Sequence, residues 1–366
     1  MKIGLDNVIV TQTVLSEVDG AKGRLIIRGV CVEDLANTST FEEVAIRLWQ
    51  GFTQDTLETL TLALGNARLR AFELLPSFLD IASKLPFIEG LRLGLASLSD
   101  KEEMPHHYLL TGAIPVFLAG LIRSKKGLAL IKPDPSLSQA ADFLRMIHGA
   151  RSDKALEQAL DKYLITISDH GMNASTFTAR CIASTGAGLI SAVIGAISAL
   201  KGPLHGGAPG PVLDMLDEIA TEDQIEKWIK EELVSGKRLM GFGHRIYQVR
   251  DPRADVLKQV VLGLRKTGNK RLIFAEQVEK AILSALAKHK PDRPLHTNVE
   301  FYTALLLEAI GLERDLFTPL FAMGRVIGWI AHVFEQEKTG RLIRPQSEYI
   351  GPVPITQHAT TMGLPS

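Results

Sequence analysis

Apolar residues recur at three- and four-residue spacing along most of the chain after Thr40. The repeat is clear in residues 41–52 (FEEVAIRLWQGF), 138–149 (SQAADFLRMIHG) and 159–171 (ALDKYLITISDHG), and glycine commonly follows it. This spacing is typical of amphipathic helices, and a glycine just past the last apolar position is typical of a helix end. The pattern therefore predicts a mainly α-helical protein.

The first thirty residues have a different pattern. Residues 8–15 (VIVTQTVL) and 23–29 (GRLIIRG) are typical of strands, and Asp19-Gly20 between them favours a tight hairpin turn. We therefore expect a small N-terminal β element ahead of the helices.

The helical segments between residues 212 and 318 carry more charge than those on either side. A chain of 366 residues with 46% apolar residues exceeds the usual size of one hydrophobic core. We therefore predict a large helical domain (1–211 and 319–366) and a smaller helical domain (212–318) inserted into it. Ligand sites often lie in the cleft between such domains.

The composition argues against several classes of protein. The 41 basic and 41 acidic residues balance, whereas a nucleic-acid-binding protein needs an excess of Lys and Arg. Cys31 and Cys181 form neither a metal-ligand motif nor a disulfide framework, which favours a reducing cytoplasm, and the N-terminus is not typical of a signal peptide. Residues 181–200 are uncharged over about the length of a membrane span, but their Gly, Ser and Ala content suits a core helix. We expect no membrane association.

Two histidines lie next to glycine-rich turns. His205 lies in "KGPLHGGAPGP", just before a helix predicted to start near Val212. A helix N-terminus favours the neutral imidazole, which can donate a hydrogen bond to a carbonyl and stabilise an enolate; capping of the turn is the simpler alternative. His244 follows Gly-Phe-Gly, and the arginines Arg250 and Arg253 after it suit a carboxylate or a phosphate, or else a surface salt bridge.

Three further polar residues lie among apolar neighbours. His170, in "SDHGMNASTFTAR", stands at a helix break and on its own would be a polar cap on a buried helix. Arg325 and Arg344 each lie beside apolar residues, and a buried arginine needs an anionic partner from the protein or from a ligand.

Glu300 lies in "LHTNVEFYTALLLEAIG", beside aromatic residues and a leucine run. A carboxylate among apolar neighbours has to be solvated, paired or used. Thr297 and Glu300 fit the S/T-x-x-E capping box, in which the glutamate side chain returns to the helix start. Capping and catalysis would compete, because a carboxylate folded back onto Thr297 points away from a substrate.

Seven motifs resemble those of the citrate synthase family, in the family's order and over nearly the whole chain. They are GRLIIRG, PDPSLSQAADFLRMIHG, DHGMNASTFTAR, GPLHGGA, MGFGHRIY with DPRA, TNVEFY and RPQSEYIGP. The resemblance implies a homodimer of mostly helical subunits whose small domain closes over the cleft. It also implies condensation of acetyl-CoA with oxaloacetate to give citrate and CoA, with acetyl-CoA as a co-substrate and no permanently bound cofactor or metal.

The resemblance also implies roles for individual residues. His205 is similar to the histidine that hydrogen-bonds the thioester carbonyl during enolisation, and His244 to the one that polarises the ketone of oxaloacetate. Glu300 occupies the position of the family's aspartate base. The residues that match the carboxylate-binding set are His170, Arg253 and Arg325, together with Arg344, which in the family reaches in from the partner subunit.

Three positions depart from the common family pattern. Glu300 replaces aspartate, and one methylene moves a carboxylate by roughly 1 Å, enough to cost about a hundredfold in rate. Pro209 follows the histidine turn where the family often has Asn-Glu. Both changes together resemble a branch of bacterial citrate synthase-like proteins. Gln248 stands where some members have a basic residue near CoA, and the candidate substitutes for phosphate contacts are Arg250, Lys237 and Arg238.

Two alternatives to a citrate synthase remain open from the sequence. A 2-methylcitrate synthase would use propionyl-CoA, and the sequence does not show the acyl pocket. A non-catalytic relative that binds CoA or a dicarboxylate is favoured by Glu300 and Pro209, whereas the retained histidines and arginines favour an enzyme.

Overall fold

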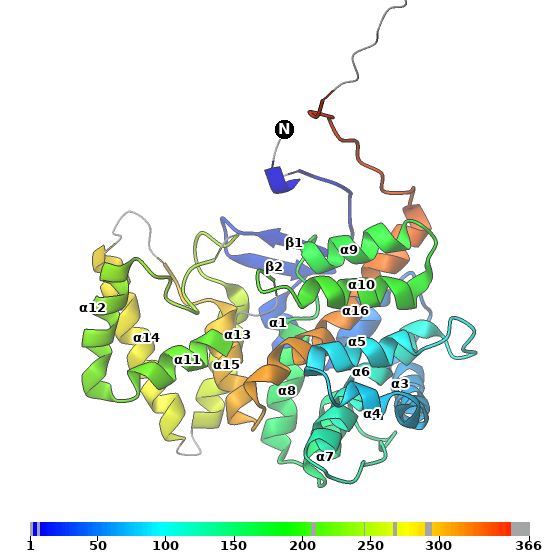
Figure 1. Ribbon diagram of the computed structural model, residues 1–366, viewed down its shortest axis with the longest axis horizontal. Helices are drawn as coiled ribbons and strands as arrows, with labels where there is room; N and C mark the ends of the chain where they lie inside the picture. The colour runs from blue at the N-terminus through cyan, green and yellow to red at the C-terminus, as the bar shows by residue number, and fades with distance from the viewer. Residues whose placement is uncertain are drawn as a thin grey trace, which may run out of the picture.

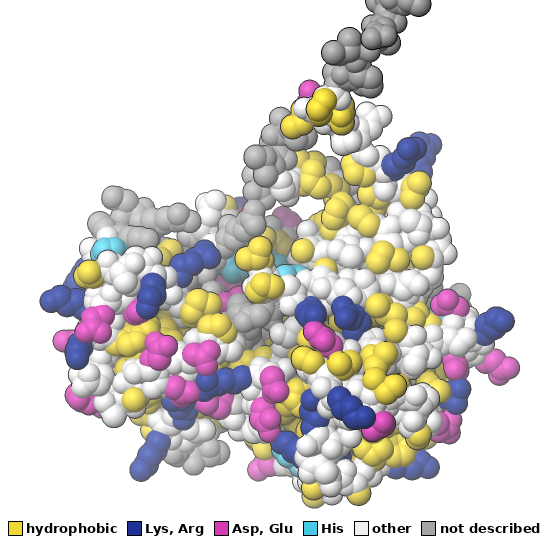
Figure 2. Space-filling view, viewed as in Figure 1, with side chains coloured by type: hydrophobic (Ala, Val, Ile, Leu, Met, Phe, Trp, Pro, Cys, Tyr) yellow, Lys and Arg dark blue, Asp and Glu magenta, His cyan; other side chains and the backbone are white. Residues whose placement is uncertain are grey.

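The computed structural model describes residues 3–5, 8–205, 210–244, 246–265, 269–289 and 295–352. Most of these residues are helical, and one small three-stranded sheet lies near the N-terminus (Figure 1). The predicted fold class is therefore confirmed. Figure 2 shows acidic and basic side chains mixed over one face, as the balanced charge of the chain leads one to expect.

The sheet is antiparallel, in the order β1 (Ser16–Asp19), β2 (Arg24–Ile27) and β3 (Val30–Cys31). The predicted hairpin is present, but its loop spans residues 20–23 and is longer than a tight turn. The predicted strand at residues 8–15 is wrong. Among the residues that the structure describes, no strand pairs with this segment, and the backbone N–H of Val14 donates instead to the Glu335 carboxylate at 2.9 Å.

The helices fall into three consecutive groups. The first group, before His205, is α1 Val32–Thr38, α2 Phe41–Trp49, α3 Leu57–Leu74, α4 Leu79–Ala82, α5 Phe87–Ala96, α6 His106–Lys125, α7 Gln139–His148, α8 Lys154–Thr166, α9 Ala174–Ala183 and α10 Gly188–Leu200. The second group is α11 Gly210–Ile219, α12 Ile225–Ser235, α13 Pro252–Arg265, α14 Lys270–His289 and α15 Val299–Ala309. The third is the long helix α16 Phe317–Thr339.

Helices α2 and α7 have the caps and the terminal glycine that their sequences indicate. The Ser138 side chain caps α7 by accepting the N–H of Ala141, and Gly149 ends the helix in the left-handed conformation at φ 84°. Helix α2 begins with a capping box between Thr40 and Glu43. In both helices the apolar residues of the repeat face the core, so local signals and burial agree.

Two helices in the described part of the chain have the length and composition of a membrane span. They are His106–Lys125 and Arg314–Lys338, but 83% and 89% of their apolar windows are buried inside the protein, as in core helices. The uncharged stretch 181–200 is not one helix, because α9 ends at Ala183 and α10 begins at Gly188.

Helix α16 runs through the interior and packs against α2, α5, α6, α8, α9 and α10. Gly328 allows its closest approach to the loop after α8, because a Cβ at this position would lie 2.2 Å from the carbonyl oxygen of Ser168. The same face of α16 carries Arg325. This contact therefore positions the loop that carries His170 against the buried arginine.

Helices α11, α12 and α14 lie together on one side of the molecule (Figure 1). Helix α13 packs against α15 and also against α1 and α8, which belong to the first group. The proposed boundary of the small domain at residues 212–318 stays a prediction.

Replacing Gly328 by alanine should destabilise the protein by about 1–3 kcal/mol, because the added methyl group meets backbone that cannot yield freely. Gly263→Ala in α13 is the matched control, since a Cβ there meets nothing within 4 Å. This control should be neutral or stabilising by up to about 1 kcal/mol through helix propensity. Thermal unfolding of both variants checks the difference, and equal stability would contradict the close approach.

Candidate active site

Six of the predicted residues come from segments far apart in the sequence and converge on one region. His170 follows α8, His205 follows α10, and His244 precedes α13. Arg253 begins α13, Glu300 begins α15 and Arg325 lies in α16. The charges of the neighbouring arginines and histidines all act on His170, and Glu300 acts on Arg253.

His170 is 8% exposed, and its Nε2 lies 3.0 Å from the hydroxyl of Tyr247. Its ring centroid is 6.1 Å from that of His244. Burial lowers the pKa of His170 well below its usual value, and the nearby cations Arg253 and Arg325 lower the pKa further. His170 is therefore neutral near pH 7.

His205 is held through one ring nitrogen. Its Nε2 accepts the backbone N–H of Ser175 at 3.3 Å. The Ser175 hydroxyl lies 2.8 Å from the same nitrogen, accepts the indole N–H of Trp329 at 3.1 Å and is 2.8 Å from the acceptor Oδ1 of Asn173. Because Nε2 accepts, the proton of the neutral ring lies on Nδ1. Burial, with a smaller effect from Arg325, lowers the pKa of His205 to about 4. The predicted neutral state is supported, but burial rather than the helix N-terminus is its main cause; Pro209 lies outside the described residues.

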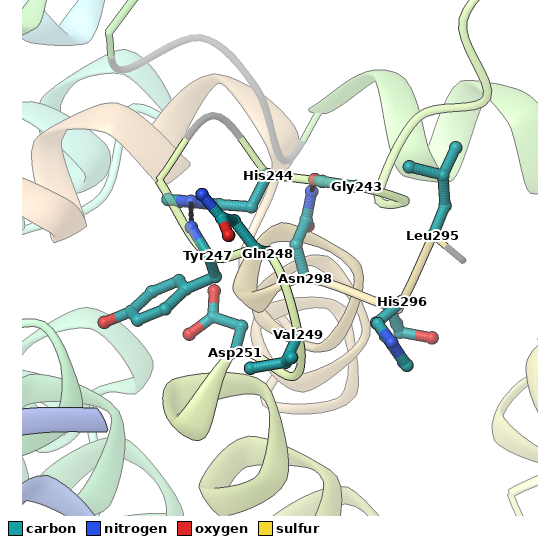
Figure 3. Close-up of a pocket in the computed structure, with 10 residues that line it drawn as sticks. Gly243, His244, Tyr247, Gln248, Val249, Asp251, Leu295, His296 and Asn298 are labelled. Atoms are coloured by element: carbon teal, nitrogen blue, oxygen red, sulfur yellow. Dashed lines mark hydrogen bonds between the residues drawn. The ribbon is translucent and has the colours of Figure 1, made fainter. Parts of the chain in front are cut away.

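His244 is held in the opposite tautomer. Its Nδ1 accepts the backbone N–H groups of Ile246 at 3.0 Å and Tyr247 at 3.1 Å, so Nε2 carries the proton (Figure 3). Burial, followed by the charge of Arg253, lowers the pKa of His244 to about 4. Its Nε2 and the Nη2 of Arg253 are 3.2 Å apart. Both are donors, so one oxygen of a ligand can accept a hydrogen bond from each.

The Gly-Phe-Gly turn before His244 joins this histidine to the start of α15. Gly241 and Gly243 have φ of 84° and 78°, which glycine adopts without strain. The N–H of Gly243 donates to the carbonyl of His296 at 2.8 Å, and the Asn298 side chain donates to the carbonyl of Gly243 at 2.8 Å. The loop that carries His244 is therefore bonded to the segment that leads to Glu300.

Arg253 is 5% exposed and forms a bidentate pair with Asp251, with its Nε 3.1 Å and its Nη2 2.9 Å from the carboxylate oxygens. Asp251 also accepts the backbone N–H of Val299 at 3.2 Å. The alternative of a surface salt bridge is therefore wrong for Arg253. It holds for Arg250, which is exposed and pairs with Glu33 and Asp255.

The predicted capping box at Glu300 is wrong. Helix α15 begins one residue later than the pattern indicates, and Asn298 is its N-cap, with its side-chain oxygen accepting the N–H of Glu300 at 3.0 Å. The hydroxyl of Thr297 donates to the buried carboxylate of Glu279 at 2.7 Å and takes no part in a cap. The Glu300 carboxylate therefore has no role in capping the helix. Burial raises its pKa, and the charge of Arg253 opposes this effect.

Arg325 is 1% exposed, and its Nε donates to the carbonyl of Ile167. Burial lowers its pKa to about 10. Within the described ranges, no carboxylate forms an ion pair with it. Arg325 is therefore buried, as its apolar neighbours indicated, and an anionic ligand is a suitable partner for its charge.

Arg344, unlike Arg325, is not a buried arginine. It is exposed in the extended segment after α16, which leaves the body of the molecule (Figure 1). In the single chain it therefore does not join the other site residues.

The three candidate phosphate contacts are all exposed. Lys237 donates to Glu232 at 2.9 Å, and Arg250 is paired with Glu33 and Asp255, so both are already engaged. Arg238 lies close enough to Glu300 for its charge to lower the pKa of that carboxyl group.

A cavity of about 320 Å³ lies between the loop that carries His244 and the segment before α15 (Figure 3). Tyr247, Gln248, Leu295 and His296 are among the residues that line it. Tyr247 and Asp251 belong to the site but were not predicted from the sequence. Tyr247 and Asp251 lie in the same loop as His244, but only the folded chain shows that they contact site residues.

Comparison with known proteins identifies the family of the chain. The family model described as "Citrate synthase, C-terminal domain" matches residues 4–346. A citrate synthase of Haloferax volcanii is 36% identical over 374 residues, covering 96% of each chain. The crystal structure of citrate synthase from Thermotoga maritima MSB8 is 38% identical with a TM-score of 0.83, covering 97% of each chain. A Thermoplasma acidophilum citrate synthase in ternary complex with carboxymethyl coenzyme A and oxaloacetate is 28% identical with a TM-score of 0.85, covering 96% of each chain. The chain belongs to the citrate synthase family.

Because Glu300 does not cap α15, its burial lowers the free energy of unfolding when the carboxyl group is ionised. Its pKa is raised in the folded state from 4.5, so the cost is absent below about pH 4.5 and grows as the pH rises through the folded-state pKa. Glu300→Gln should therefore be as stable as the wild type near pH 4.5 and more stable near pH 8. Thermal unfolding at the two pH values checks this.

Asn298→Ala is the contrasting variant. It loses the cap and the bond to Gly243 and should be less stable by about 1–2 kcal/mol at both pH values. A Glu300→Gln variant that is no more stable than the wild type near pH 8 would contradict the cost of the buried charge, and a wild-type level of stability at both pH values is what a capping role predicts, since glutamine also serves a capping box.

Proposed function

We propose that this protein catalyses the citrate synthase reaction, in which acetyl-CoA, oxaloacetate and water give citrate and CoA. The observation that carries the proposal is the state of His205 and His244. Each has one ring nitrogen that accepts a backbone N–H, so each presents an N–H donor from the other nitrogen without carrying charge. Such a pair can stabilise oxygen atoms that gain negative charge.

In this proposal Glu300 takes a proton from the methyl group of acetyl-CoA. Burial raises the pKa of this carboxyl group, which makes its carboxylate a better proton acceptor than an exposed one. The Nδ1–H of His205 donates to the thioester oxygen as the enolate forms. This step therefore uses one base and one hydrogen-bond donor, at opposite ends of the acetyl group.

The enolate carbon then attacks the ketone carbon of oxaloacetate. The ketone oxygen accepts hydrogen bonds from the Nε2–H of His244 and from Arg253. It gains one proton, which balances the proton removed by Glu300, and becomes the hydroxyl group of citryl-CoA. Water cleaves the thioester, and CoA leaves as the thiol. Every step uses side chains and the two substrates, with no metal ion or bound cofactor.

The carboxylates of oxaloacetate are assigned to His170, Arg253 and Arg325. Arg325 supports this assignment because its buried charge lacks a carboxylate in ion-pair contact among the described residues. Of the three exposed candidates for the CoA phosphates, Arg238 is retained and the other two, already paired, are weaker. A cytoplasmic location remains part of the proposal and rests on the two free cysteines.

Release of thiol from acetyl-CoA in the presence of oxaloacetate tests the reaction, and no release would refute it. Propionyl-CoA in place of acetyl-CoA tests the 2-methylcitrate alternative. One methylene in an apolar pocket discriminates by only about 1–3 kcal/mol, so the two kcat/KM values have to be compared. Tight oxaloacetate binding without turnover would support the non-catalytic alternative.

Glu300→Gln should lose roughly 10²–10⁴-fold in kcat if Glu300 is the base. Glu300→Asp keeps a carboxylate, displaced by about 1 Å, and should lose less. Steady-state kinetics of the two variants measure the difference, with thermal unfolding to show that both are folded. A Gln variant with near wild-type kcat would exclude Glu300 as the base.

We also propose a homodimer in which Arg344 completes the site of the partner subunit. Its support is that Arg344 is exposed in a segment that leaves the body of its own chain. Glu300→Gln and Arg344→Ala should each be inactive as homodimers. Mixed dimers should regain activity, because one of their two sites then has both Glu300 and Arg344 intact.

The mixing experiment separates the two arrangements of Arg344. If Arg344 served the site of its own chain, both sites of a mixed dimer would be defective and no activity would return. Mixed dimers are formed by unfolding and refolding the two variants together, and each variant refolded alone is the control.

A further inference from the structure

One face of α16 carries polar residues that the proposed reaction does not use. His332 and Gln336 follow Arg325 and Trp329 at helical spacing, so all four lie on the same face of the helix. They are 6% exposed or less. This face packs on α9 and on the loop that carries His170.

His332 is fully buried and bridges an arginine and a carboxylate. Its Nδ1 lies 3.0 Å from Nη1 of Arg180, and its Nε2 lies 3.1 Å from Oδ1 of Asp169. A guanidinium group only donates, so Nδ1 of His332 is the acceptor. The proton of the neutral ring therefore lies on Nε2, which donates to Asp169.

Asp169 directly precedes His170 and is fully buried. Its Oδ2 accepts the hydroxyl of Ser16 and the backbone N–H of Gly171 at 3.2 Å. The Ser16 hydroxyl in turn accepts the same N–H of Gly171 at 3.1 Å. The residues on both sides of His170 are thus fixed by one carboxylate and one serine.

Arg180 holds His332 in this tautomer and connects it to the N-terminal segment. Its Nη1 donates to Glu335 at 2.7 Å and its Nε to Gln336 at 3.2 Å. The other oxygen of Glu335 accepts the N–H of Val14 at 2.9 Å. One hydrogen-bonded network therefore joins residues 14–16, α9 and α16 to the loop of His170.

We propose that His332 is a positioning residue for the substrate dicarboxylate. By donating to Asp169 it holds the loop that carries His170 and that accepts, through a backbone carbonyl, the Nε–H of Arg325. His170 and Arg325 are two of the three groups assigned to the carboxylates of oxaloacetate. Ser16, from β1, is the second support of the same loop. The inference rests on the proposed function, because it concerns the affinity for oxaloacetate at that site.

A buried polar cluster can also contribute to stability without affecting a substrate. A positioning role predicts a change in the affinity for oxaloacetate, whereas a role in stability alone does not. His332→Leu removes both hydrogen bonds of the ring. His332→Gln keeps an amide N–H for Asp169 and an oxygen for Arg180. Ser16→Ala removes only the second support and lies on a partly exposed strand, so it should fold if the leucine variant does not.

The dissociation constant for oxaloacetate is measured by calorimetry, which needs no turnover, and the KM values for both substrates are measured by thiol release. His332→Leu should weaken oxaloacetate binding by about tenfold or more, as expected for loss of a hydrogen bond to a buried charge. Its KM for acetyl-CoA should stay within about twofold, since the network does not touch that substrate. Ser16→Ala should give a loss of about threefold, and His332→Gln should recover most of the leucine variant's loss.

Leu144→Ala is the control for stability, because Leu144 is fully buried in α7 and lies outside the network. It should lower the melting temperature and leave oxaloacetate binding unchanged. Lower melting temperatures with unchanged oxaloacetate affinity in the His332 and Ser16 variants would overturn the inference. A wild type that binds oxaloacetate without turnover would refute the proposed reaction alone, and a wild type that does not bind it would refute both.

Discussion

Arg253 and Arg325 are both buried in the candidate site, and the environment of the site depends on which anions accompany their charges. Arg253 is paired through two hydrogen bonds with Asp251. By contrast, Arg325 has, among the described residues, a carbonyl bond, a contact with the ring of Phe321 and the more distant charge of Asp169. A buried cation is costly unless an anion accompanies it. Among the described residues, the fold therefore leaves the buried guanidinium of Arg325 without a carboxylate in ion-pair contact, which favours binding of an anion.

The same two charges, added to burial, keep the neighbouring histidines neutral. The pKa values of His170, His205 and His244 are all lowered, with burial as the first cause and an arginine as the next. A neutral imidazole can act as a donor only if its proton lies on the correct nitrogen. Backbone N–H groups decide this for His205 and His244, so the tautomers are set by the main chain and do not depend on a substrate.

Local sequence signals predicted the helices and the glycine turns well. Apolar spacing found most of the helices, and the Gly-Phe-Gly turn indicated His244 because positive φ angles there are a local requirement. Arg325 was predicted as a buried cation from its apolar neighbours alone. The family motifs then supplied the candidate site residues, of which all but Arg344 and the exposed phosphate candidates converge in the single chain.

The errors arose where distant residues decide a local outcome. Thr297 was predicted to cap α15, but its hydroxyl is taken by Glu279, which lies 18 residues earlier on another helix. Residues 8–15 have strand-like composition, but no strand lies beside them to pair with. His332 and Tyr247 went unnoticed because their partners Asp169 and His170 are 163 and 77 residues away, and no local pattern reports such contacts.

The side chain of Asn298 shows how closely helix and loop are joined. Its oxygen accepts from the N–H of Glu300, while its nitrogen donates to the carbonyl of Gly243. Deamidation to aspartate would leave the shape unchanged and preserve the cap, but it would set a negative oxygen against that carbonyl. Deamidation of Asn298 would therefore repel the loop that carries His244, while the start of α15 would stay capped. The geometry of the site would change although the stability of the helix is kept.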